Sequence, residues 1–291
     1  MPRINRAIEL LAAGQPVYSD TVVELTHGSG VRQAGTWADC LIVDLEHQPF
    51  DTTRLGDFMR GLVAGGPADT GHRTPAVIVT LPTDGSDART VRTNRWMIQQ
   101  ALAAGVHGLI LCHAEAPAAV KAFVEGARYS FQDLGVGSLL EAGRRGSGGQ
   151  HTAAEIWGLS VADYLECADV WPLNPSGELM LGLKIENRRA LVQAEASIAV
   201  PGIAFAEWGP GDMGMSYGYR EAHDPPYPPD MLAARERVKT ACDRSGIAFL
   251  DIMQRDNVAA LIDAGVKIGA TTREVAAMGR QHSRRKAGTA G

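Results

Sequence analysis

Five short polar segments each follow an apolar, β-type run, which is where a parallel-strand enzyme carries its chemistry. They are Asp44-Leu45-Glu46-His47, Cys112-His113, Lys184 with Glu186, Gly209 to Asp212, and Asp251. Carboxylates are the ligands that hard cations such as Mg²⁺ prefer, and an imidazole transfers protons near neutral pH. These residue types predict metal-assisted acid–base chemistry, provided that the fold brings the segments to one rim.

Lys184 and Glu186 stand two residues apart at the end of a strand, so their side chains point to the same face. A buried carboxylate needs a cation or hydrogen-bond donors to offset its desolvation. One interpretation is a plain ion pair between the two residues. The other is that Glu186 binds a metal in a barrel mouth and Lys184 lies one layer below it.

Asp212 follows a Gly-Pro-Gly turn, where glycine lets the backbone approach a ligand closely and exposed N–H groups can bind a carboxylate. Asp212 either caps the next segment or joins Glu186 as a second metal ligand, an arrangement that suits Mg²⁺ with several waters. His47 follows an acidic pair and is the natural general base, although an ordinary loop histidine is the alternative.

The elements that must position these residues alternate along the chain. Eight β-type runs begin at residues 16, 39, 75, 106, 179, 203, 247 and 266, and helical patterns separate most of them. Repeated βα units favour a parallel sheet, and eight of them predict an α/β fold that closes into a (β/α)8 TIM barrel. A doubly wound open sheet is the alternative, which the lack of an early G-x-G-x-x-G weakens.

The alternation breaks between residues 130 and 178. We interpret this stretch as a long insert between strands 4 and 5 of a single catalytic domain, residues 1–280, followed by a flexible tail, residues 281–291. Connections of this length usually form a lid or an interface. Within the insert we predict a helix from Thr152 to Tyr164, with Thr152 as its N-cap and Glu155 completing a capping box. The glycine-rich tract at 143–149 is predicted to be mobile.

Composition excludes several classes of function. The chain has 291 residues and a net charge of −5, and it contains no basic run long enough to follow a phosphate backbone. Its four cysteines are widely separated, so no zinc knuckle or redox pair is indicated. It also lacks a signal-peptide pattern and a stretch of about 18 apolar residues. We therefore expect a cytoplasmic protein that binds neither nucleic acid nor membrane.

Three blocks of the chain resemble the HpcH/HpaI aldolase family, the class II pyruvate aldolases. DCLIVDLEHQPFD resembles a family strand with a D-x-E-H ending, and GLKIENRRAL resembles its V-x-x-E-[ST] block. GIAFAEWGPGDMGMSYGY is similar to its G-x-x-G-P-x-D-L-[SA] block. The blocks are Asp39–Asp51, Gly182–Leu191 and Gly202–Tyr219, and they occur in the family's order.

The resemblance implies a (β/α)8 barrel, assembled as a dimer or hexamer, that cleaves a 4-hydroxy-2-oxo acid. The products are pyruvate or a related 2-oxo acid and an aldehyde. It implies a cofactor of Mg²⁺, Mn²⁺ or Co²⁺, with Glu186 and Asp212 as metal ligands and His47 as the catalytic histidine. The backbone amides of Gly211 and Asp212 would bind the substrate carboxylate.

Four more residues complete the predicted site. Lys184 and Asp44 are catalytic candidates beside His47, and His113 and Trp208 are substrate-binding candidates. A Lys184 Schiff base is a variant in which the lysine, not a metal, activates the substrate.

The chain departs from the family where an Arg in a V-R-x-P pattern polarises the keto oxygen. We assign that place to Ile78 in AVIVTLP, and such a donor can be worth about 3–4 kcal/mol of barrier. Either Lys184, His113, Arg92 or Arg95 replaces it, or the substrate is atypical. The alternatives are a related metal-enolate enzyme (a decarboxylase, hydratase or acyl-CoA lyase) and a non-catalytic acid-binding barrel.

Overall fold

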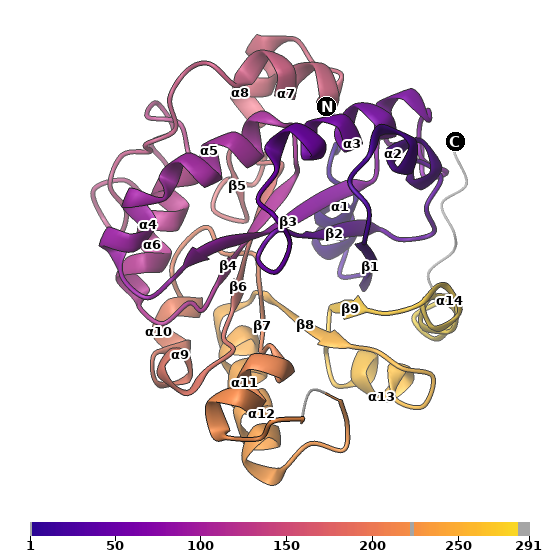
Figure 1. Ribbon diagram of the computed structural model, residues 1–291, viewed down its shortest axis with the longest axis vertical. Coiled ribbons are helices and arrows are strands. Elements are labelled where there is room, and N and C mark those ends of the chain that lie inside the picture. Colours follow the sequence, from indigo (N-terminus) through magenta and orange to yellow (C-terminus); the bar gives the residue numbers. More distant parts are fainter. Residues whose placement is uncertain (1, 222–223, 285–291) are drawn as a thin grey trace.

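Nine parallel strands form one sheet in the computed structural model, which describes residues 2–221 and 224–284. The strand order is β4-β3-β2-β1-β9-β8-β7-β6-β5, and pairing of β4 with β6 closes eight of the strands into a barrel (Figure 1). The short β5 pairs with β6 beside the ring. The bounds are β1 Val17–Val22, β2 Cys40–Asp44, β3 Ala76–Asp84, β4 Gly108–Cys112, β5 Val170–Trp171, β6 Leu179–Lys184, β7 Phe205–Glu207, β8 Ala248–Ile252 and β9 Ile268–Ala270. The predicted (β/α)8 barrel and all eight of its predicted strands are confirmed.

Helices surround the barrel and cover the outer faces of its strands (Figure 1). The long α12 fills its predicted range: proline occupies its first position, and Gly246 ends it in the left-handed conformation with φ of 69°. The bounds are α1 Arg6–Ala12, α2 His27–Gln33, α3 Thr52–Ala64, α4 Ala88–Thr93, α5 Arg95–Ala103, α6 Pro117–Ala127, α7 Gln150–Trp157, α8 Val161–Cys167, α9 Arg188–Val192, α10 Ala194–Ile198, α11 Pro210–Tyr217, α12 Pro229–Ser245, α13 Val258–Asp263 and α14 Arg273–His282.

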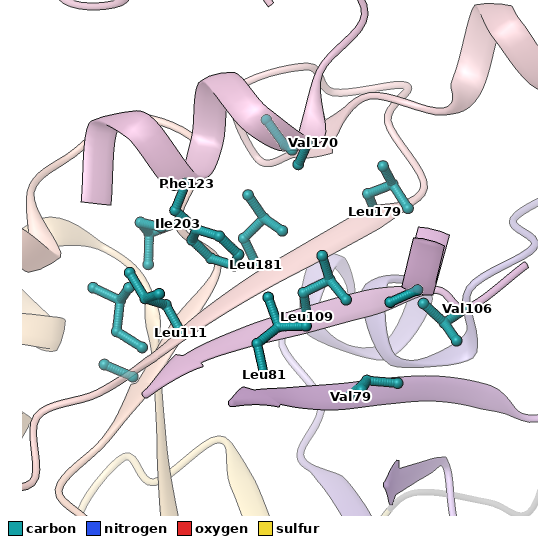
Figure 2. Packing of buried hydrophobic residues seen from close by; sticks show 14 of the residues in the cluster. Val79, Leu81, Val106, Leu109, Leu111, Phe123, Val170, Leu179, Leu181 and Ile203 are labelled. Carbon is teal, nitrogen blue, oxygen red and sulfur yellow. The ribbon is translucent and has the colours of Figure 1, made fainter. Parts of the chain in front are cut away.

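Alternation along each strand divides the core into two parts. In β3, Ala76 and Ile78 belong to the core inside the barrel, whereas Val77 and Val79 pack outward against the helices. Figure 2 shows part of the outer core, with Phe123 of α6 lying over side chains from β4 and β6. Because successive side chains alternate, inward-facing residues at the carboxyl ends of the strands are the ones that reach the mouth.

Two helices, α7 and α8, occupy the part of the insert where one helix from Thr152 to Tyr164 was predicted, so that prediction is wrong. Gly158 takes the left-handed conformation with φ of 72° and ends α7, so the chain breaks there. The Ser160 side chain then caps α8 by accepting a hydrogen bond from the Asp163 amide at 3.1 Å. Thr152 lies inside α7 and is not its cap, because the helix begins at Gln150.

The glycine-rich tract predicted to be mobile, residues 143–149, contains a buried arginine, Arg145. The Arg145 amide donates to the Arg128 carbonyl at 2.8 Å, and its guanidinium lies 4.4 Å from the centre of the Tyr129 ring. Arg128 itself forms a buried bidentate pair with Asp169 at 2.7 and 3.1 Å. These contacts bind the first part of the insert to the end of α6.

Most of the predicted tail, residues 285–291, lies outside the described residues. Its first residues, Gln281 and His282, close α14. In the described part of the chain, no helix is both long enough and apolar enough to cross a membrane.

Candidate active site

Lys184 is the central cation of the barrel mouth. It ends β6 in register with Glu207 of β7, and its ammonium lies 2.7 Å from Glu46 Oε2 and 3.5 Å from Glu186 Oε2. Burial alone would lower the pKa of Lys184, but the surrounding carboxylates outweigh it and raise the pKa above the ordinary lysine value. Lys184 is therefore a fixed ammonium, which is unsuited to Schiff-base chemistry because a protonated amine is no nucleophile.

Asp44 organises the loop that carries Glu46 and His47. Its Oδ1 accepts hydrogen bonds from the Glu46 amide at 2.9 Å, the His47 amide at 3.1 Å and the Thr80 hydroxyl at 2.9 Å. Burial opposes ionisation, but these donors prevail and hold the pKa of Asp44 below its usual value. The geometry thus places Asp44, predicted as catalytic, beneath the loop as its anchor.

Glu46 is an anion, and one of its carboxylate oxygens accepts two hydrogen bonds. Its Oε2 accepts from Lys184 and, at 3.0 Å, from the Cys112 thiol. Although burial favours the neutral acid, the charge of Lys184 prevails and lowers the pKa of Glu46. Burial raises the pKa of Cys112 well above the ordinary thiol value, so the thiol stays protonated and acts as the donor.

Glu186 is the most constrained carboxylate of the site. It is 0% exposed, and its Oε1 accepts from the His113 amide at 2.7 Å, while its Oε2 has no hydrogen-bond partner among the described residues. Burial raises the pKa of Glu186 to about 8, which Lys184 opposes and Glu46 reinforces. A buried carboxylate oxygen without a donor is costly, and a cation would offset that cost.

Gly209 makes room for this carboxylate. It has φ of 48°, and a Cβ there would lie 2.4 Å from Glu186 Cβ and 2.8 Å from its Oε2. Both the left-handed backbone and the close approach require glycine. The Gly-Pro-Gly turn singled out in the sequence is thus the wall against which Glu186 packs.

Two carboxylates that were not among the predicted site residues, Glu46 and Glu207, complete the mouth. Glu46, His113 and Glu186 offer ligand atoms that all lie within 4.8 Å of one another, a candidate metal cluster within residues 2–221 and 224–284. Glu207 is half-buried, and burial raises its pKa, which Lys184 opposes and Glu46, Asp251 and Asp212 reinforce. Glu207 could have been found from its place at the end of a strand, next to the Lys184 strand in the predicted barrel order.

The remaining predicted residues, including the predicted metal ligand Asp212, are not members of this cluster of described residues. His47 is 60% exposed at its side chain, with Nε2 3.6 Å from Glu46 Oε2. Asp212 and Gly211 lie in the first turn of α11, where amide groups have no acceptor within the helix. Trp208 is buried, and its Nε1 donates to Asp251 Oδ1 at 3.1 Å.

The assignment of the family Arg to Ile78 is wrong. Ile78 lies in the apolar interior of the barrel, below the mouth, because its side chain belongs to the inner core. Aligned on Pro82, the V-R-x-P pattern instead puts the missing Arg at Thr80. The Thr80 hydroxyl reaches the mouth, where it also accepts from the Leu45 amide at 3.0 Å.

Two arginines proposed as replacements lie away from the mouth. Arg92 approaches Glu125 of α6 at 3.9 Å, and the side chain of Arg95 also runs along α6, 3.6 Å from the Cβ position of Gly126. The rim instead carries Arg189, which binds both oxygens of Glu115 at 2.9 and 2.6 Å. Of the four suggested donors, only Lys184 and His113 therefore lie at the site.

Comparison with known proteins matches this fold and site to one family. Residues 31–279 match the model of the HpcH/HpaI aldolase/citrate lyase family. A hydroxypyruvate/pyruvate aldolase from Pseudomonas aeruginosa is 28% identical over 73% of this chain and 67% of its own length. The chain belongs to the HpcH/HpaI aldolase/citrate lyase family, and it is an enzyme of the aldolase type, as the three sequence blocks predicted.

Solved structures share the fold at lower identity. An HpcH/HpaI aldolase/citrate lyase family protein from Burkholderia cenocepacia J2315 superposes with a TM-score of 0.72 at 22% identity, over 96% of this chain and 98% of that one. The citrate lyase beta subunit of M. tuberculosis, in complex with oxaloacetate and magnesium, has a TM-score of 0.53 at 15% identity, over 92% of this chain and 97% of that one.

Proposed function

We propose that this chain catalyses divalent-metal-dependent, reversible aldol cleavage. The substrate is a 4-hydroxy-2-oxo acid, and the products are pyruvate or a related 2-oxo acid, such as hydroxypyruvate, and an aldehyde. The observation that carries this proposal is the fully buried Glu186, whose Oε2 has no hydrogen-bond partner among the described residues. Lys184 lies closer to Glu46 Oε2, at 2.7 Å, than to Glu186 Oε2, at 3.5 Å, so Glu186 Oε2 can accept a further cation.

Glu186 and Asp212 would hold that cation. Their oxygens suit Mg²⁺, Mn²⁺ or Co²⁺. The hydrogen bonds of Glu46 to Lys184 and Cys112 use Oε2, and its Oε1, 3.5 Å from His113 Nε2, faces the mouth. When bound, the cation supplies Lewis-acid stabilisation of the negative charge that cleavage places on the 2-oxo acid. Oxygen ligands dominate the set, which favours Mg²⁺ or Mn²⁺ over zinc.

The amides of Gly211 and Asp212 bind the carboxylate of the 2-oxo acid. They stand in the first turn of α11, whose first helical hydrogen bond is donated by Met213 to the Gly209 carbonyl at 2.9 Å. Unpaired amides at a helix start, together with the helix dipole, favour an anion. This contact places the reacting carbons between α11 and the loop that carries His47.

His47 removes the proton of the 4-hydroxyl group as the carbon–carbon bond breaks. Its exposed side chain can approach the aldehyde half of the substrate, and Glu46 Oε2, 3.6 Å away, orients the imidazole. Asp44 acts as a positioning residue, because its Oδ1 fixes the amides of both Glu46 and His47. Trp208 and Asp251 form one buried wall of the same mouth.

A related metal-enolate reaction without aldol cleavage is the second candidate. Thr80 occupies the place of the family Arg, so the site lacks the guanidinium that usually polarises the keto oxygen. A decarboxylase, a hydratase or an acyl-CoA lyase would need Glu186 and Asp212 but not that donor. Release of an aldehyde from a 4-hydroxy-2-oxo acid separates the aldolase from these enzymes.

The test is a screen of pyruvate and hydroxypyruvate against a panel of aldehydes, with Mg²⁺, Mn²⁺ or Co²⁺ and with a chelator. We expect turnover that the chelator abolishes, and a loss of at least about 10³-fold in Glu186→Gln, because an amide cannot become the carboxylate that would bind the cation. Glu195→Gln is the matched control, since Glu195 pairs with Arg237 on the outer surface. Chelator-resistant turnover, or full activity in Glu186→Gln, would refute the proposal.

A further inference from the structure

His113 occupies an unusual backbone position in the centre of the site. It follows β4 directly and has φ of 46°, in the left-handed region that few non-glycine residues adopt. Its amide donates to Glu186 Oε1 at 2.7 Å, which fixes the residue against the buried carboxylate. One ring nitrogen, Nδ1, lies 3.2 Å from Asn187 Nδ2 and 3.5 Å from Glu186 Oε1, and the other, Nε2, lies 3.5 Å from Glu46 Oε1.

Asn187 has one possible orientation of its side-chain amide. Its Oδ1 accepts from the Ala190 amide at 2.9 Å and caps α9, while its Nδ2 donates to Glu115 Oε1 at 3.0 Å. Glu115 is a carboxylate held by Arg189. A flipped amide would set oxygen against the carboxylate and N–H against N–H, so both contacts select the same orientation.

The remaining hydrogen of Asn187 Nδ2 determines the tautomer of His113. Nδ2 lies 3.2 Å from His113 Nδ1, closer than Glu186 Oε1 at 3.5 Å, and because Nδ2 is a donor, Nδ1 is the acceptor in this contact. In a neutral imidazole the proton then resides on Nε2. His113 Nε2 faces Glu46 Oε1 at 3.5 Å across the mouth, so its N–H points at the space between the two residues.

We propose that Asn187 fixes His113 as the neutral, Nε2-protonated imidazole, which makes it a hydrogen-bond donor to the keto oxygen of the substrate and not a metal ligand. A histidine binds a metal through an unprotonated nitrogen. Here Nδ1 is engaged by Asn187 and Nε2 carries the proton, so neither lone pair is available. The substrate contact rests on the proposed function, but the tautomer does not.

This role supplies the donor that Thr80 cannot. The hydroxyl of Thr80 already donates to Asp44, whereas the Nε2–H of His113 faces the interior of the site. A donor aimed at an oxygen that gains negative charge contributes more in the transition state than in the ground state. Asn187 acts through His113 and is a positioning residue.

The tautomer can be read directly by long-range ¹H–¹⁵N correlation NMR of the metal-free, ¹⁵N-labelled protein at a pH where histidines are neutral. We expect a protonated Nε2 and an unprotonated Nδ1 for His113, unchanged when Mg²⁺ alone is added. His107 is an internal reference in the same spectrum, because its Nδ1 accepts from the Val77 amide at 3.1 Å. His113→Asn assigns the signal, and asparagine tolerates the left-handed backbone.

Two substitutions at Asn187 then test its role while keeping an oxygen to cap α9. Asn187→Asp replaces the donor with an acceptor, so the His113 proton should move to Nδ1 while the His107 signals stay unchanged. Asn187→Ser removes the contact, so the two tautomers of His113 should coexist. We expect kcat to fall roughly 10²-fold in Asn187→Asp and roughly 10-fold in Asn187→Ser, with KM changing by less than about threefold.

A wild-type His113 protonated on Nδ1 would overturn the proposal, as would loss of the Nε2 proton when Mg²⁺ is added. An unchanged tautomer in Asn187→Asp, with the cap intact by thermal melting, would overturn it as well. A protein that shows the expected tautomer but no aldolase activity supports the His113 assignment and overturns only the proposed function.

Discussion

Strand β4 has a histidine next to each of its ends, and the two side chains lie in different environments. His107, just before the strand, is fully buried and stacks on Trp157 with ring centres 5.3 Å apart. Asn5, which caps α1, donates to the His107 carbonyl at 3.3 Å, so the N-terminal helix closes this end of the barrel. His113, just after the strand, is partly exposed among carboxylates and an amide.

The comparison shows what turns a histidine into a functional group. Both rings have an acceptor Nδ1 fixed by a neighbouring N–H, from Val77 at His107 and from Asn187 at His113. At the sealed end the other nitrogen, His107 Nε2, has no partner within the described ranges, and burial lowers the pKa of the ring to about 3. At the mouth the other nitrogen faces Glu46, so the same tautomer can serve a substrate.

The largest effect is expected from a substitution of Gly209, which packs against Glu186 in the mouth. Gly209→Ala would place a Cβ 2.4 Å from Glu186 Cβ and force a residue with a side chain to hold φ of 48°. We expect activity to fall by at least roughly 10³-fold, because Glu186 must move, and the free energy of unfolding to fall by about 2–4 kcal/mol. Steady-state kinetics and denaturant unfolding of the same preparation measure both quantities.

Gly218→Ala is the matched control at the other end of α11. Gly218 has φ of 92°, but a Cβ there meets nothing within 4 Å. It should therefore lose only the backbone preference, about 1 kcal/mol, and retain turnover. Equal losses of activity in the two variants would mean that Gly209 matters for its backbone conformation alone and not for its closeness to Glu186.

The sequence predicted the barrel better than it predicted the site. Apolar runs such as AVIVT and LMLGLK form strands in the structure, as their sequence pattern predicts. Glycines mark several of the helix ends. The break at Gly158 was missed because a helix continued through one glycine costs only about 1 kcal/mol, so pattern alone cannot locate the end.

The sequence indicated which types of residue form the site, but it did not indicate which of them contact one another. Lys184 and Glu186 were found because a two-residue spacing fixes a shared face. The pairing of Lys184 with Glu46, 138 positions away, depends on closure of the ring, which no local pattern encodes. Ile78 and Thr80 share one face of β3 but lie in different layers, and the V-R-x-P pattern aligned on Pro82 selects Thr80, so the misplacement of Ile78 came from the alignment of the pattern.

A smaller effect is expected at the closed end of the barrel, where His107 is buried. The pKa of His107 is about 3 in the folded protein, against about 6.5 in an unfolded chain. The unfolded state therefore binds more protons between these values, and the stability that the neutral ring contributes is present above about pH 6.5. It is lost as the pH falls towards 3, by up to about 4–5 kcal/mol in the free energy of unfolding. Urea unfolding across this range gives the slope.

His107→Asn isolates this contribution. The asparagine Oδ1 can still accept from the Val77 amide, but the side chain does not titrate, so the slope between pH 6.5 and 4 should flatten. Loss of the stacking with Trp157 should lower the stability at pH 7 by about 1–3 kcal/mol. His113→Asn, at the open end of the same strand, should leave the slope of the wild type in place; a flattened slope there would contradict the contrast between the two ends.

The smallest effect belongs to Thr80, which joins the mouth to the strand beneath it. Its hydroxyl donates to Asp44 at 2.9 Å and accepts from the Leu45 amide at 3.0 Å. Thr80→Val keeps the shape but removes this acceptor from the Leu45 amide and one of the three donors from Asp44 Oδ1. We expect a loss of about 1–3 kcal/mol in stability, and turnover lowered roughly 10-fold because the loop that carries Glu46 and His47 loosens. Thr83→Val breaks a comparable contact to Asn94 at 3.1 Å on the same strand and should cost stability without turnover. If turnover falls equally in both variants, the hydroxyl of Thr80 supports the strand and has no specific part in positioning the catalytic loop.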